Sequence, residues 1–170
     1  KNTWNLGGKL AVSNRFNYAQ HPMDLPGNKT QTGFSHELHF GKSSGRFNFS
    51  VSQERTDTNY SSNDMGYFTN NNYLKHDAWA EYKWTEPKNW HNQVFLNLNG
   101  DVNYLAKKIA PADEIYQNAE INFNINIQSK KLWWIGAHTD YSFVENDFYE
   151  PRIPGWYFKR GASIGLGAIF

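Results

Sequence analysis

The chain has 170 residues, the size of one domain, and 17% of them are aromatic, which is a high share. Its 17 Lys and Arg nearly balance its 16 Asp and Glu, so we expect neither a nucleic-acid partner nor a charged disordered tail. The sequence contains no cysteine, which excludes disulfides, thiolate zinc sites and cysteine nucleophiles.

Hydropathy excludes a membrane-spanning helix but not membrane-spanning strands. The longest apolar stretch, residues 132–137, is far shorter than the roughly 20 residues that such a helix needs. A barrel strand needs only about 9–11 residues and alternates apolar with polar side chains, so the mean hydropathy of −0.77 is compatible with it. The chain starts at Lys1 with neither an initiator methionine nor a signal peptide, so we expect it to be a processed product, an expressed segment or part of something longer.

Eight segments alternate between apolar and polar residues, which predicts strands. In chain order they are residues 4–13, 34–40, 47–52, 77–84, 94–104, 119–127, 133–143 and 161–170. The clearest is 119–127, where an alanine, three isoleucines and a phenylalanine occupy every second position and Glu or Asn the others. A strand places these two sets on opposite faces, whereas a helix would scatter them.

The predicted connections alternate between long and short. Residues 18–31, 56–72 and 106–114 form the long ones, and residues 42–45, 86–89 and 129–131 the short turns. Outer-membrane barrels have long loops outside and tight turns on the periplasmic side. No linker divides the chain, so residues 1–170 are predicted to form a single β-barrel segment without an internal boundary.

Aromatic residues near the predicted strand ends also favour a membrane barrel, because aromatic belts lie at membrane interfaces. They are Trp4, Phe16, Tyr73, Trp84, Trp90, Tyr104, Trp133 and Phe143. A soluble β-sandwich has the same period of two and remains the alternative fold. The predicted fold class is therefore all-β, an antiparallel transmembrane β-barrel with about eight strands here.

Two motifs are more specific than the periodicity. Residues 63–68 (NDMGYF) are followed by residues 71–73 (NNY), and residues 145–152 (ENDFYEPR) by residues 155–160 (GWYFKR). They resemble the C-terminal outer-membrane β-barrel region of a Bacteroidota family of unknown function, in which an N-terminal module similar to family 9 carbohydrate-binding modules precedes this region. The resemblance covers most of the chain, from about the second strand to Arg160. Family members are much longer, so the resemblance implies that the natural polypeptide extends beyond both ends of this chain, which would then be a segment of a larger barrel.

The resemblance implies a location in the bacterial outer membrane and a structural or transport-related role, with a link to glycan handling through the upstream module. Its implied partners are outer-membrane lipid and, as open options, other outer-membrane or periplasmic proteins and a glycan. The family has no established catalytic residues to carry over. A secreted soluble β-sandwich that binds carbohydrate and a hydrolase are the two alternative functions.

The sequence predicts no catalytic residue, metal site or cofactor, and it leaves any ligand-binding residues unknown. His36 and His39 are three apart, which on a strand puts them on opposite faces and prevents joint metal binding. The carboxylates Glu145, Asp147 and Glu150, with Asp140 nearby, match no calcium loop. No nucleophile elbow, phosphate loop or dinucleotide motif is present, so no enzyme activity is expected.

Polar residues of the two motifs are predicted to be architectural. Asn63, Asp64 and Asp147 would accept backbone N–H bonds in turns, and Arg152 would pair with a loop carboxylate. Exposed aromatic residues such as Trp79 and Trp156 have the chemistry to stack on sugar rings, although packing or interface anchoring is the commoner role.

Overall fold

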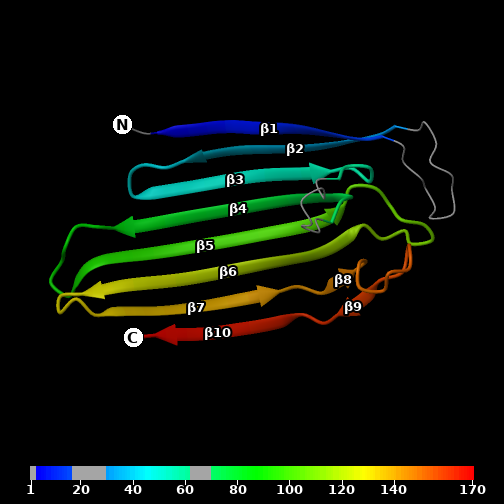
Figure 1. Ribbon diagram of the computed structural model, residues 1–170. Coiled ribbons are helices and arrows are strands. Elements are labelled where there is room, and N and C mark those ends of the chain that lie inside the picture. Colours follow the sequence, from blue (N-terminus) through cyan, green and yellow to red (C-terminus); the bar gives the residue numbers. More distant parts are fainter. Residues whose placement is uncertain (1–2, 17–29, 62–69) are drawn as a thin grey trace.

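The computed structural model describes residues 3–16, 30–61 and 70–170, which form two antiparallel sheets (Figure 1). The strands are β1 (Trp4–Arg15), β2 (Gln31–Lys42), β3 (Phe47–Thr56), β4 (Tyr73–Trp84), β5 (His91–Leu105), β6 (Tyr116–Ser129), β7 (Trp134–Ser142), β8 (Glu145–Asp147), β9 (Phe158–Arg160) and β10 (Ser163–Ile169). Strands β1 to β7 and β10 form the large sheet in that order, and β8 pairs with β9. In the described part, no helix has the length and apolar character needed to cross a membrane.

The eight predicted strands correspond to β1–β7 and β10, so the all-β, antiparallel prediction is confirmed. The pair β8 and β9 was not predicted, because strands of three residues are too short for a period of two to be recognised. Several strands are longer than predicted, up to 15 residues in β5, against a usual strand length of about 5–6 residues.

The register sorts the side chains of the large sheet into two faces. Val51 lies opposite Phe40 and Ala78, whereas Asn99 lies opposite Trp79 and Asn122. We call the first side the apolar face; it carries Leu6, Leu10, Leu38, Phe40, Val51, Leu98, Ile121, Phe123, Ile135 and Leu166. The other side, the polar face, carries Lys9, Glu37, Glu54, Asp77, Glu81, Asn99, Asp101, Glu120, Asn122, Asn124 and Asp140.

The large sheet is a single layer with almost no core. Among the described residues, the buried apolar side chains are Val94, Leu105 and Phe148. By contrast, Leu10 is 75% exposed and Leu166 is 78% exposed, both on the apolar face. No second sheet covers this face in the part of the chain that the structure describes.

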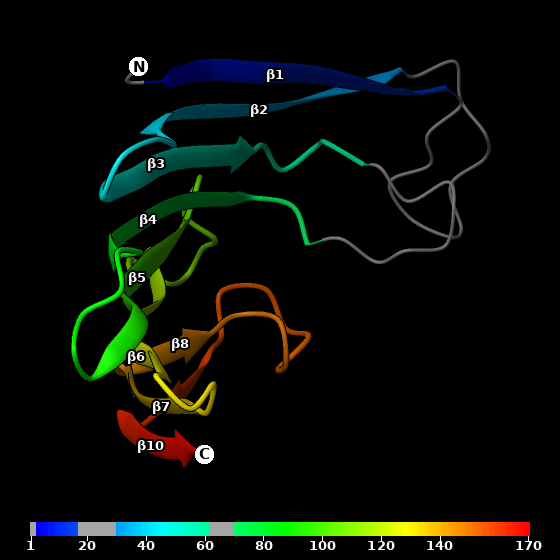
Figure 2. The same cartoon turned by 90° about the vertical axis from the view of Figure 1, so that its left-hand side faces the viewer.

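The sheet curves from one edge to the other, and β8 lies on the inner side of this curve (Figure 2). Asn118 of the polar face and Asn146 of β8 line the same cavity. The polar face is therefore the concave one and the apolar face the convex one. A soluble half-barrel would have the opposite arrangement, because its concave side would enclose the apolar core.

The described sheet is not closed into a barrel. Strands β1 and β10 lie at its two opposite edges, and each pairs with one neighbour only (Figure 1). The antiparallel sheet thus agrees with the coarser part of the predicted fold class, and the closed transmembrane barrel remains a prediction.

Long and short connections lie at opposite ends of the sheet (Figure 1). Residues 43–46, 85–90 and 130–133 connect strands at one end, and residues 106–115 and 143–162 connect them at the other. The connections over 16–30 and 57–72 join strands at this second end, and they lie partly outside the described residues. The predicted alternation is confirmed for the described connections.

Hydrogen bonds of Asp57 hold the segment after β3 against β2, and we call this contact the clasp. It makes Gly33 sensitive to substitution. Asp57 accepts a hydrogen bond from the Phe34 N–H at 2.9 Å and also bonds the Asn59 and Tyr60 N–H groups at 2.9 and 2.7 Å. These bonds fold residues 59–60 so closely over Gly33 that a Cβ there would overlap their backbone atoms.

We therefore expect Gly33→Ala to lower the free energy of unfolding of the full-length protein by about 1–3 kcal/mol through overpacking. Gly100→Ala is the matched control, because its Cβ would lie 3.5 Å from the nearest backbone atom and alanine suits a strand better than glycine. Urea titration followed by tryptophan fluorescence measures both. Equal stability of the two variants would show that the clasp is absent.

Candidate functional site

The polar face carries the only dense grouping of ionisable side chains in the described part of the large sheet. On adjacent strands Asp77 lies opposite Asp101, and Asp101 lies opposite Glu120. One row of the sheet thus holds three carboxylates, each about 5 Å from the next in backbone spacing. Like charges in such positions destabilise a sheet unless water or hydrogen-bond donors offset the repulsion.

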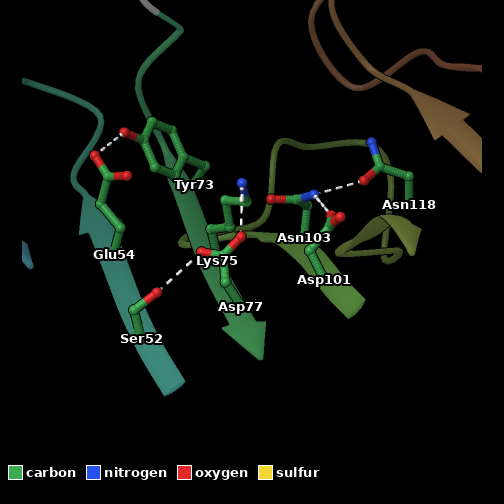
Figure 3. Close-up of polar contacts among 8 residues, drawn as sticks. All are labelled: Ser52, Glu54, Tyr73, Lys75, Asp77, Asp101, Asn103 and Asn118. Carbon is green, nitrogen blue, oxygen red and sulfur yellow. Dashed lines mark hydrogen bonds and ion pairs between the residues drawn. The ribbon is translucent and has the colours of Figure 1, made fainter. Parts of the chain in front are cut away.

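Two of the three carboxylates, Asp77 and Asp101, bond to neighbouring donors (Figure 3), which reduces this repulsion. Lys75 Nζ lies 2.8 Å from Asp77 Oδ1, and the Ser52 hydroxyl donates to Asp77 Oδ2 at 3.2 Å. Asn103 Nδ2 donates to Asp101 at 2.9 Å and to Asn118 at 2.6 Å.

The Tyr73 hydroxyl donates to Glu54 on the neighbouring strand (Figure 3). Tyr73 therefore lies on the polar face. Its position near a strand end predicted a place in an aromatic belt, but such a belt would lie on the opposite, apolar face.

A ladder of amides continues this network across β5, β6 and β7. Asn97 and Asn99 donate to Asn124 and Asn122, each at 3.0 Å. Along β6, Asn126 donates to Asn124 and Asn124 to Asn122, each at 3.1 Å. Asn122 in turn donates to Asp140 on β7. The asparagines of residues 119–127 therefore bond to each other across and along strands, which fixes the register of this region.

The polar face has an acidic balance. Its carboxylates are Glu37, Glu54, Asp77, Glu81, Asp101, Glu120 and Asp140, and its cationic side chains are Lys9, Arg15, Lys75 and Lys83. Sequence analysis missed this grouping, because its members are about 20 residues apart along the chain. Only the register, which brings Asp77, Asp101 and Glu120 into one row, reveals it.

The histidines lie where the period of two places them. By register His36 belongs to the apolar face and His39 to the polar face. His36 Nε2 lies 3.4 Å from Gln53 Oε1. Over residues 3–16, 30–61 and 70–170, no group of three His, Cys, Asp or Glu residues has metal-binding geometry.

The motif around Asp147 fixes a turn. Asp147 Oδ1 accepts the N–H groups of Tyr149 and Glu150, both at 3.0 Å, as the sequence predicted. Its Oδ2 lies 2.8 Å from Arg160 Nη2, and Arg160 Nη1 lies 3.6 Å from Glu145. The arginine that pairs with these carboxylates is thus Arg160 of β9. It is not Arg152, for which the sequence predicted this role and which adopts a φ of 55° in the connection.

Other candidate residues are dispersed. Asp140 belongs to the amide ladder of the large sheet, so it does not join Glu145, Asp147 and Glu150 at one site. Asn63 and Asp64 lie outside the described residues. Trp79 lies on the polar face opposite Ser50 and Asn99, and Trp156 is 63% exposed between β8 and β9.

These observations define a class of protein: a long-stranded, single-layer antiparallel sheet with one hydrogen-bonded polar face and one exposed apolar face. Residues 1–170 match the family model described as "Domain of unknown function (DUF5916)", and the chain belongs to this family. No curated protein and no solved structure matches the chain.

The turn geometry predicts that Asp147 matters more to stability than Arg152. Asp147→Ala removes two bonds to backbone N–H groups and the ion pair with Arg160, so it should lower the free energy of unfolding by about 1–3 kcal/mol. Arg152→Ala, at the same turn, should change it by less than about 0.5 kcal/mol. Urea titration of the full-length variants measures both values. A larger loss for Arg152→Ala would contradict this account of the turn.

Proposed function

We propose that this chain forms an eight-stranded sector of an outer-membrane β-barrel in bacteria, with a structural or transport-related role. The exposed apolar face carries the proposal: Leu6 is 82% exposed, Leu98 50% and Leu166 78%, on three different strands of one face. Soluble monomers rarely expose large continuous apolar patches. Lipid chains are a medium in which such a face is stable.

The two sheet edges and the strand lengths support the same proposal. An open sheet edge is not stable within lipid, because its N–H and C=O groups would lack partners. We infer that strands supplied from outside this chain, or from a second copy, complete the ring between β1 and β10. Strands β1 to β6 have 10 to 15 residues, which reaches the roughly 9–11 that a bilayer requires.

The polar face would then line a hydrated interior. Its carboxylates and amides lie on the concave side of the sheet, where water would hydrate the row of Asp77, Asp101 and Glu120. Its acidic balance would favour cations over anions near this wall. No catalytic role is proposed for the chain.

The distribution of tryptophan supports the proposed placement in the bilayer. Trp4 begins β1, Trp84 ends β4, and Trp90 and Trp133 directly precede β5 and β7. All four lie at the end of the sheet with the short turns, which in outer-membrane barrels is the periplasmic end.

The alternative functions have less support. A carbohydrate-binding β-sandwich requires a second sheet over the apolar face, and the described residues provide none. A hydrolase requires paired acid and base groups in a cleft. The carboxylates of the polar face lie on an open surface and bond to structural donors. Glu145 and Asp147, which line a cavity beside β8, both pair with Arg160. The glycan link and the upstream module implied by the resemblance stay predictions.

Neighbouring residues of β3 test the proposal. Val51→Arg places a charge on the apolar face, where Val51 is 45% exposed, and should reduce the stability of the full-length protein in lipid vesicles by about 2–4 kcal/mol near the bilayer midplane. Ser50→Arg places the same side chain on the polar face and should change stability by less than about 1 kcal/mol. Urea-dependent folding into vesicles, followed by tryptophan fluorescence, measures both variants.

Ser50 is a better control than a residue of β6. Ile125→Arg and Asn124→Arg would also be neighbours on opposite faces, but Asn124 belongs to the amide ladder and its loss would destabilise the sheet independently. If Val51→Arg and Ser50→Arg are equally tolerated, or if the wild-type protein is stable and monomeric without detergent, the membrane proposal is wrong.

A further inference from the structure

A polar cavity of about 740 Å3 lies where β8 meets the start of β6. Gln117 and Asn118 contribute from β6, Asn146 and Asp147 from β8, and Tyr149 from the following turn. Asn146 Nδ2 donates to the Tyr116 carbonyl at 3.0 Å, which joins β8 to β6 at this point. Figure 1 shows β8 at the end of the sheet with the long connections.

Two amide side chains in this cavity are deeply buried and incompletely bonded. Gln117 is 7% exposed and Asn146 is 5% exposed. Gln117 Nε2 and Asn146 Oδ1 are buried and have no hydrogen-bond partner. A buried polar atom without a partner costs about 1–3 kcal/mol, and such atoms are uncommon in folded proteins. Their presence in one cavity indicates that a ligand supplies the missing bonds.

The orientation of these groups specifies complementary bonds. Because Asn146 Nδ2 is committed to the Tyr116 carbonyl, its Oδ1 is fixed as an acceptor directed away from that bond. Gln117 Nε2 is a donor. A hydroxyl group can donate to the first atom and accept from the second, so a ligand that carries several hydroxyl groups has the chemistry to satisfy both.

Tyr149 adds a third polar group to the cavity wall. Burial raises the pKa of Tyr149, an effect that the nearby Gln117 amide partly offsets and Asp147 reinforces. The phenol therefore stays protonated, and it donates to the Asn71 carbonyl at 3.0 Å. The Gln117 amide lies close to the Tyr149 hydroxyl, but its Nε2 atom meets no acceptor with hydrogen-bond geometry.

The charges of the cavity disfavour a charged ligand. Asp147 already accepts two backbone N–H groups and pairs with Arg160, and Glu145 pairs with the same arginine. Glu150 and Arg152 also line the cavity and carry opposite charges. Together with Arg160, these groups leave little net charge to select an anion or a cation. The unsatisfied groups are neutral amides, which suit a neutral ligand.

We propose that the β6–β8 cavity binds a neutral, hydroxyl-rich small molecule of the size of a monosaccharide or disaccharide, held by Gln117 and Asn146. A volume of about 740 Å3 is within the usual range of about 300–1,000 Å3 for small-molecule sites. The inference does not depend on whether the large sheet crosses a membrane, because β6, β8 and the turn at Tyr149 form the cavity.

The test uses the full-length protein in lauryldimethylamine oxide micelles, because detergents with sugar headgroups would compete for the cavity. Saturation-transfer NMR titrations compare glucose and cellobiose with glucuronate and glucosamine, which carry a negative and a positive charge. We expect millimolar or tighter binding of at least one neutral sugar and weaker binding of both charged sugars. Absence of binding by both neutral sugars, or tighter binding of either charged sugar, overturns the proposal without any variant.

A matched pair of variants on β6 tests the assignment to the cavity. Gln117→Met keeps the shape of the side chain and removes the donor, so it should weaken neutral-sugar binding about tenfold or more, with an unchanged or raised melting temperature. Gln128→Met makes the same change at the far end of β6 and should leave binding unchanged. If Gln117→Met lowers the melting temperature more than Gln128→Met does, or leaves binding intact, Gln117 is structural and the proposal is wrong.

Discussion

The fold depends on one constraint: a single-layer sheet has no interior, so each side chain of a strand belongs to one of two surfaces. Only three apolar side chains are buried among the described residues. Contacts among the described residues therefore supply little hydrophobic burial, which is the main favourable term in most folds, and in the proposed placement lipid supplies it. Hydrogen bonds between the strands hold the chain as a sheet. The stability of this sheet depends on what contacts its convex, apolar face.

The polar face shows what the same constraint does to charged groups. A soluble sheet with one wet face can disperse its charges, but here Asp77, Asp101 and Glu120 lie in one row, and asparagines occupy the adjacent row. Hydrogen bonds from Ser52, Lys75 and Asn103 make this arrangement tolerable (Figure 3). Such cross-strand bonding also opposes register slippage, which would transfer every apolar side chain to the wrong face.

Sequence patterns could predict the large sheet but not the contacts between its strands. The error-free alternation of residues 119–127 indicated β6 and the identity of its two faces, because period two is a local property. The pairing of Asp77 with Asp101 depends on the register, and that of Asp147 with Arg160 on how the β8–β9 connection folds back. The β6–β8 cavity was missed for the same reason, since neither Gln117 nor Asn146 belongs to a recognisable ligand motif. The closed barrel stays a prediction, because β1 and β10 are the edges of the described sheet.

The topology separates two parts of the molecule, the large sheet and the connection that contains β8 and β9. Strands β7 and β10 are neighbours in the large sheet, and the whole of β8 and β9 lies in the connection between them. That connection is an insertion in an otherwise plain hairpin. No strand pair of the large sheet includes a residue of this connection. The ladder of the sheet and the chemistry at this end of it therefore depend on different residues.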